Sequence, residues 1–167
     1  EQSARLDNAV TDRVGVVTGI RGLIRHRTIQ AIGETAHAGA VDFPYRKDAA
    51  LACARFSSRL YDFWQHELSL GRDLVATTGV IRTSPSASMN KIAGECIVSL
   101  DARSLSAAEL NLFEKKVEAI LQETAEETGV IFKTDPLMRI APVEADEGVM
   151  KKLETSADIL KIGTQRM

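Results

Sequence analysis

The sequence is poor in the residues that build disulfide scaffolds and metal centres. Its 167 residues include two cysteines, three histidines, four prolines and one tryptophan. Cys53 and Cys96 each stand alone inside an apolar segment, which excludes a disulfide framework and favours a reduced, cytoplasmic setting. Both thiols are expected to be buried and inert.

An excess of one charge and a long apolar run are also missing. The 21 basic and 23 acidic residues give a net charge of −2, so no overall field attracts nucleic acid or an anionic membrane. No apolar run approaches the roughly 18 residues of a membrane span. Residues 1–5 do not resemble a signal peptide. We therefore expect neither nucleic-acid nor membrane partners.

Common catalytic motifs are absent as well. The glycines at positions 15, 19 and 22 lie in or beside a predicted strand and open no phosphate-binding helix. The serines at 84, 86 and 88 have no nucleophile-elbow context. No histidine stands four residues from another histidine or a cysteine, and a zinc site needs three or four ligands. We expect this chain alone to hold no metal and to catalyse nothing.

Periodicity and capping residues predict the secondary structure. Apolar residues recur at helical spacing over 48–68, with Gly71 just beyond. Ser106 and Glu109 form a capping-box pattern at the start of a second helix, which Gly129 closes. Alternating or β-branched residues predict strands, a Gly- or Ser-rich composition predicts loops, and a short terminal helix is expected. The strands are 14–20, 23–32, 74–81, 95–101 and 130–132; the loops are 35–46 and 83–90; the terminal helix is 149–160.

Without the first strand, these elements follow the order βαββαβ. That order predicts an α+β, ferredoxin-like fold, with an antiparallel sheet and both helices on one face. Such a fold hosts many functions, so function has to come from particular residues.

Both ends of the sequence suggest a larger protein. The chain does not start with Met, and residues 162–167 end without a helix cap, charged tail or turn. Natural boundaries usually fall in polar linkers. We therefore expect a piece of a longer chain.

Three polar residues stand out as candidates for binding or catalysis. His37 lies in a loop of small residues that leaves room for a ligand or another chain, although a surface histidine is equally compatible. Asn90 follows a Ser-rich loop, where Asn is usually a turn or cap residue. Arg103 ends a strand and can simply pair with Asp101. Together they would suit a substrate with a carbonyl and a carboxylate, which an Arg grips with two hydrogen bonds. Spacing alone does not show that they converge.

Several stretches resemble one family in the correct order. Residues 34–40 (ETAHAGA), followed by Pro44, Arg46 and Asp48, resemble the opening of the small lid, or dimerization, domain of metal-dependent M20-type amidohydrolases. The N-terminal residues, the stretch 90–94 (NKIAG) and the stretch 100–103 (LDAR) are similar to one subgroup. This subgroup contains N-carbamoyl-L-amino-acid hydrolases, allantoate amidohydrolases and ureidopropionases.

The resemblance implies a division of the chain. Residues 1–12 would leave a catalytic domain, residues 13–141 would form the lid, and residues 142–167 would return. Two divalent metal ions of the zinc or manganese class would activate water in the full-length enzyme, and their ligands would lie outside this chain.

The resemblance also implies roles for single residues. His37 would reach across a homodimer to the partner's scissile carbonyl, while Asn90 and Arg103 would hold the substrate, Arg103 by its carboxylate. An edge strand and the helix over 48–68 would form the dimer contact. The substrate would be a small ureido or N-carbamoyl acid.

The sequence departs from the family pattern at several positions. Ser3 and Ala4 follow Glu1 and Gln2 where Gly-Pro is common, residues 41–44 replace a Thr-Pro-Met stretch, and Ala93 stands where proline is usual. The alternative is a non-catalytic ferredoxin-like dimerization or ligand-binding module.

Overall fold

The structure, a computed structural model, describes residues 13–167. Its main body is an antiparallel sheet with two long central strands, β3 (Gly22–Ile32) and β8 (Glu95–Ser104). Short strands complete the two edges: β5 (Val75–Thr77) and β6 (Ile81–Thr83) pair with β8, while β9 (Ile131–Thr134) and β10 (Met138–Ile140) pair with β3.

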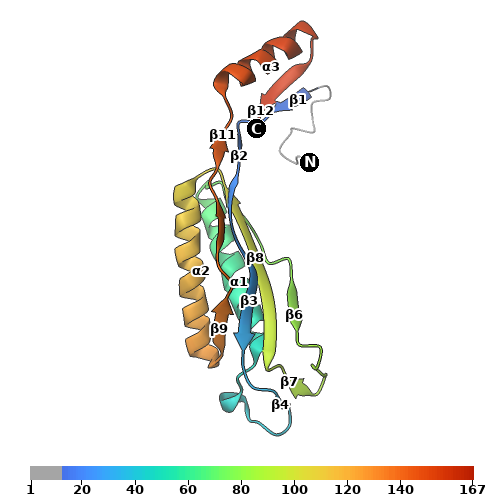
Figure 1. Ribbon diagram of the computed structural model, residues 1–167, viewed down its shortest axis with the longest axis vertical. Coiled ribbons are helices and arrows are strands. Elements are labelled where there is room, and N and C mark those ends of the chain that lie inside the picture. Colours follow the sequence, from blue (N-terminus) through green and yellow to red (C-terminus); the bar gives the residue numbers. More distant parts are fainter. Residues whose placement is uncertain (1–12) are drawn as a thin grey trace.

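Two long helices cover one face of this sheet. They are α1 (Ala49–Ser69) and α2 (Ala107–Thr128), which lie side by side in Figure 1. Along the chain the elements follow the order β3, α1, β5/β6, β8, α2 and β9/β10. This order and the sheet pairing confirm the ferredoxin-like fold that the sequence predicts.

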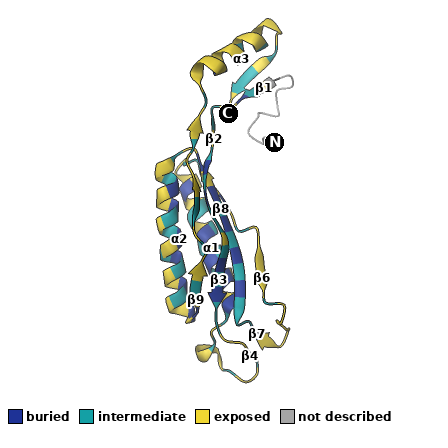
Figure 2. Ribbon diagram, in the orientation of Figure 1, coloured by how far each residue is buried: buried dark blue, intermediate teal, exposed yellow. Residues whose placement is uncertain are grey.

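The core lies between the sheet and the helices, where Figure 2 shows the buried residues. Phe56 of α1 and Phe113 of α2 are its largest members, and both are fully buried. Ile24 and Val98 meet them from the central strands. Burying each large apolar side chain stabilises the fold by about 2 kcal/mol. The apolar stripes of both helices therefore drive the two-layer packing.

The helix ends follow the predicted signals. The Asp48 carboxylate accepts hydrogen bonds from the backbone N–H groups of Ala50 and Leu51, and the Ser106 hydroxyl accepts one from Glu109. Only half of the predicted capping box forms, because the Glu109 carboxylate accepts its hydrogen bond from the Ser104 hydroxyl instead. The Ser106 N–H, which the carboxylate would bind in a capping box, donates to the Ser104 hydroxyl oxygen at 2.9 Å.

Several predicted elements differ from the structure. The strand predicted over 14–20 forms two strands, β1 (Arg13–Val16) and β2 (Gly19–Ile20), because the first pairs with residues 163–166 and the second with residues 143–144. The strand predicted over 95–101 continues to Ser104, because β3 pairs with it up to that residue. The strand predicted over 74–81 is split into β5 and β6 because residues 78–80 bulge opposite Ser99, which hydrogen-bonds Val80 through its backbone and its hydroxyl. Strand β10 was not predicted. The last helix, α3 (Glu147–Ile159), begins two residues earlier than expected because Asp146 caps it.

A second, smaller group of elements lies beyond one end of the main sheet (Figure 1). The antiparallel strands β2 (Gly19–Ile20) and β11 (Val143–Glu144) lead to it. It contains the parallel pair β1 (Arg13–Val16) and β12 (Gly163–Arg166), with α3 packed against both strands. The predicted first segment, residues 1–12, lies outside the described residues. The division at 13–141 stays a prediction.

The length and the polarity of the helices decide whether they could span a membrane. None of the helices within residues 13–167 combines the length and the apolar character needed to cross a bilayer.

Candidate functional site

The loop that carries His37, next to β4 (Ala36–His37), lies at the end of the sheet opposite the smaller group of elements (Figure 1). Here β4 pairs with β7 (Lys91–Ile92), and His37 stands opposite Lys91. The Ala38 N–H donates to the Asn90 carbonyl at 2.9 Å. These backbone pairs hold two candidate residues, His37 and Asn90, on adjacent segments although 53 positions separate them in the sequence.

A backbone hydrogen bond fixes which nitrogen of His37 carries the proton. The Gly39 N–H donates to Nδ1 at 3.1 Å, so Nδ1 acts as the acceptor. In the neutral imidazole the proton then resides on Nε2. Because the side chain is exposed, Nε2 offers an N–H to a ligand or to another chain.

The amide of Asn90 is also oriented. The Ser88 hydroxyl donates to Asn90 Oδ1 at 2.8 Å, and the Lys91 N–H donates to the Ser88 carbonyl at 3.0 Å. Asn90 therefore sits in a turn, as Asn commonly does. With Oδ1 engaged, the NH₂ group is the donor that this exposed side chain offers. No signal in the sequence pointed to Ser88 as the residue that sets this orientation.

Arg103 lies on β8 and pairs with Asp101, as its position predicted. Its Nε donates to Asp101 Oδ1 at 2.8 Å, and Arg25 Nε of the adjacent strand donates to Oδ2 at 2.7 Å. Partial burial opposes ionisation of Asp101, but the hydrogen bonds from Arg103 and Arg25 outweigh it, so the pKa of this carboxyl lies below its ordinary value. The carboxylate thus holds Arg103, which remains 45% exposed, at the surface of the sheet.

The three candidate residues do not meet within one chain. His37 and Asn90 are near the start of β8, where the Gly33 N–H donates to the Gly94 carbonyl. Arg103 is near the other end of that strand. A strand rises about 3.3 Å per residue, which puts Glu95 and Arg103 roughly 26 Å apart. An amino-acid derivative is far shorter than this, so one copy of the chain cannot present all three groups to one molecule.

Arg46 shapes the loop that follows His37. Its guanidinium donates to the carbonyl of Val41 at 2.8 Å and to that of Ala38 at 2.5 Å. These bonds fold the loop back before the short 3₁₀ helix η1 (Phe43–Tyr45), whose two aromatic side chains are exposed. Arg46 is one of the residues that carries the family resemblance, and its contacts give that position a structural role.

The described residues offer no metal site. Within residues 13–167, no group of three or more His, Cys, Asp and Glu side chains has an arrangement that could hold a metal ion. The two cysteines are free and buried, as predicted. Contact with the Cys96 thiol and burial raise the pKa of Cys53 far above its usual range, so Cys53 stays a protonated, unreactive thiol.

Comparison with known proteins identifies relatives of this segment. No protein-family model matches the chain. A ureidoglycolate hydrolase of Arabidopsis thaliana is 30% identical over all of this chain and 34% of its own length. An allantoate amidohydrolase of Bacillus subtilis (strain 168) is 30% identical over 88% of this chain and 34% of its own length.

Solved structures give the same relationship. An amidase of the hydantoinase/carbamoylase family from Burkholderia phymatum is 27% identical, with a TM-score of 0.81 over 100% of this chain and 41% of that one. The chain spans about a third of the length of the curated relatives it matches. Over most of its length, the chain is therefore homologous to a segment of the amidohydrolases of the hydantoinase/carbamoylase family.

Proposed function

We propose that this chain is the lid and dimerization segment of a metal-dependent amidohydrolase. The complete enzyme would cleave a C–N bond of a small ureido or N-carbamoyl acid, such as allantoate, in the cytoplasm. The observation that carries the proposal is the placement of the candidate residues: an oriented His37–Asn90 pair at one end of the sheet and an anchored arginine at the other. Homology to amidohydrolases supports the reaction class.

Each of the three residues has a role that suits its chemistry. The His37 Nε2–H would donate to the substrate carbonyl oxygen, where negative charge develops during attack. The Asn90 NH₂ group would add a second hydrogen bond. Arg103, held by Asp101, would bind the substrate carboxylate, which a guanidinium recognises through parallel hydrogen bonds.

The distance between the two ends favours a site shared by two copies. In a homodimer, His37 and Asn90 of one copy would approach a substrate bound near Arg103 of the other. Strand β6 supports this, because it pairs only with β8 within the described residues and leaves its other edge open. Ile81 on β6 and the preceding Val80 are about half exposed. An open edge with apolar residues is suited to pairing with a second copy, and α1 lies beside it.

The smaller group of elements would contact the rest of the enzyme. Its parallel strands carry exposed Val14, and α3 exposes Val149 and Leu153. Parallel sheets are normally buried on both faces, so these side chains suit a contact with further protein. The two divalent metal ions remain part of the proposal, and they would be held there. No step at the metal follows from the residues described.

The alternative is a non-catalytic dimerization or ligand-binding module with the same fold. The open edge of β6 is compatible with such a module. Activity of the complete protein separates the two functions.

The proposal is tested by assaying the complete protein that contains this chain. N-carbamoyl-L-amino acids, allantoate and ureidoglycolate would be the substrates, before and after chelation and with zinc or manganese restored. We expect metal-dependent hydrolysis of at least one substrate. A folded, metal-loaded protein that hydrolyses none of them would favour the non-catalytic module.

A further inference from the structure

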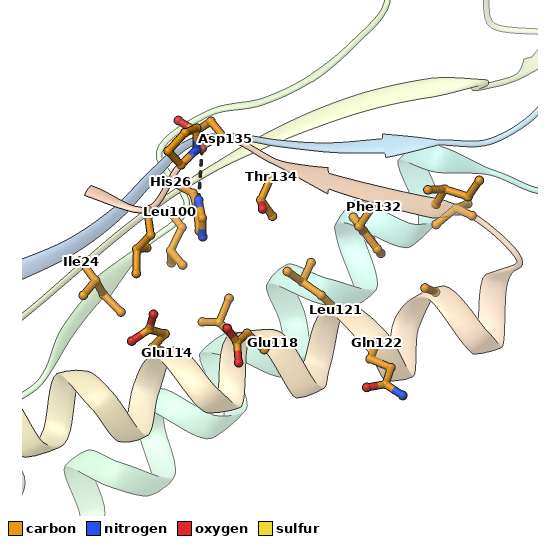
Figure 3. A pocket seen from close by; sticks show the side chains of 16 residues that line it. Ile24, His26, Leu100, Glu114, Glu118, Leu121, Gln122, Phe132, Thr134 and Asp135 are labelled. Carbon is orange, nitrogen blue, oxygen red and sulfur yellow. Dashed lines mark hydrogen bonds and ion pairs between the residues drawn. The ribbon is translucent and has the colours of Figure 1, made fainter. Parts of the chain in front are cut away.

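A groove lies between α2 and the sheet edge formed by β9 and residues 135–137 (Figure 3), and His37 is not among the residues that line it. Its volume is about 820 Å³, within the range of small-molecule sites. Aliphatic and aromatic side chains form its floor: Ile24, Leu100, Val117, Leu121, Phe132 and Leu137. The groove is therefore large enough and apolar enough to take the body of a small organic molecule.

Two irregularities of the sheet lie beside this groove. The register between β3 and β8 shifts between His26 and Ile29, which marks a bulge. At the same place the edge breaks between β9 and β10, and Asp135 accepts hydrogen bonds from the N–H groups of Arg27 and Thr28, both at 3.2 Å. Asp135, which lines the groove, thus ties the bulge and the break together.

His26 enters the groove from the sheet. It takes the position after Ile24 on the helix-facing side of β3, and its side chain is 13% exposed. Nδ1 lies 3.1 Å from Asp135 Oδ1. An ionised carboxylate only accepts hydrogen bonds, so Nδ1 carries the proton and Nε2 is the acceptor of the neutral ring. No group within residues 13–167 is hydrogen-bonded to Nε2.

Acidic side chains of α2 form the opposite wall. Figure 3 shows Glu114 and Glu118 on the helix across from the imidazole. Glu114 pairs with Arg139, whereas Glu118 has no ion pair within the described part of the chain. Together with Asp135, three carboxylates face this groove and one guanidinium neutralises one of them. The rim is therefore negative, and its histidine presents an acceptor.

We propose that this groove binds a small organic ammonium compound with an apolar body. The ammonium group would pair with Glu118 and donate one of its N–H groups to His26 Nε2, and the body would cover Leu121 and Phe132. Anions are disfavoured by the carboxylates. This site is independent of the proposed hydrolase function, because it shares no residue with His37, Asn90 or Arg103.

The test is titration of the isotope-labelled full 167-residue chain with phenethylammonium, followed by NMR. We expect shifts of the His26 ring and of Val117 and Leu121 methyl groups, with a Kd of about 1–10 mM, the range for a ligand of this size. Phenylacetate, which carries the opposite charge, should bind at least about fivefold more weakly. Equal binding of both, or shifts confined to other surfaces, would overturn the proposal.

Variants assign the binding to individual groups. Glu118→Gln should weaken phenethylammonium binding roughly threefold, the order for an exposed ion pair. Glu123→Gln, on the same helix but outside the groove, should leave it unchanged. His26→Gln removes the oriented acceptor. If the His26 variant unfolds, the Glu118 variant still decides the test. Equal affinities of the Glu118 and Glu123 variants would contradict the proposed ammonium contact.

Discussion

Orientation by neighbouring polar groups is the common feature of the candidate residues. Gly39 fixes the tautomer of His37, Ser88 fixes the amide of Asn90, and Asp101 holds Arg103. Each partner lies within two residues of the group that it orients. A side chain held in this way loses little conformational entropy when it meets a ligand. At the scale of single residues, the chain therefore presents pre-oriented hydrogen-bond donors at two surfaces.

His37→Ala in the complete protein should lower kcat by about 10²-fold, because it removes one donor to a developing oxyanion. His66→Ala is the control, since His66 is exposed in the last turn of α1. Steady-state kinetics on the best substrate measures both variants. Equal turnover of the two variants would show that His37 takes no part in catalysis.

Asp101→Asn tests the anchoring of Arg103. The pKa of Asp101 is lowered in the folded state, so its carboxylate adds stability above its ordinary pKa of 3.8, and this contribution disappears as the pH falls through the lower folded value. At pH 7 the variant should lose about 1 kcal/mol of unfolding free energy. Urea unfolding between pH 7 and pH 3 should show the gap closing. Asp62→Asn, on the exposed side of α1, should show no such gap.

Secondary-structure elements follow mostly from local signals, and these signals were readable in the sequence. Asp48, Ser106 and Gly129 set the helix ends, and the apolar stripes give the core faces. The split of β5 from β6 and the edge strand β10 were not predictable, because both depend on partners far along the chain. The split depends on Ser99, whose hydroxyl accepts a hydrogen bond from the Val80 N–H, and β10 depends on its pairing with β3.

Gly129→Ala should destabilise the chain by about 1 kcal/mol. Gly129 ends α2 at φ 67°, in the left-handed region, which costs a residue with a Cβ roughly 1–2 kcal/mol. An added Cβ would meet only the Lys47 side chain at ordinary contact distance, so backbone strain is the sole cause. Gly79→Ala is the control, since nothing lies within 4 Å there. Thermal unfolding should separate the two variants by several degrees.

At the scale of the whole molecule, the central strands separate two ends that carry the candidate residues. The sequence supplied the three candidate residues and their family resemblance, but it could not show their separation. That separation depends on the length of β8 and on the pairing of β4 with β7. Because of this separation, we propose that the three residues meet at one substrate only when two copies of the chain associate.

Ile81→Asp should weaken self-association of the full chain. The charge would be placed on the open edge of β6, where a second copy would have to bury it. Ile131→Asp, on the exposed opposite edge, is the matched control and should leave the mass unchanged. Light scattering across a concentration series measures the mass. A wild-type chain that stays monomeric at high concentration would argue against dimerization through this segment.

Complementation between two inactive variants tests the shared site most directly. Complete proteins carrying His37→Ala or Arg103→Ala are assayed alone, and then after unfolding and refolding together. If each site takes His37 from one copy and Arg103 from the other, a mixed dimer contains one intact site. Random pairing should then restore about a quarter of wild-type turnover. Activity that stays at the level of the separate variants, although mixed dimers form, would contradict the account.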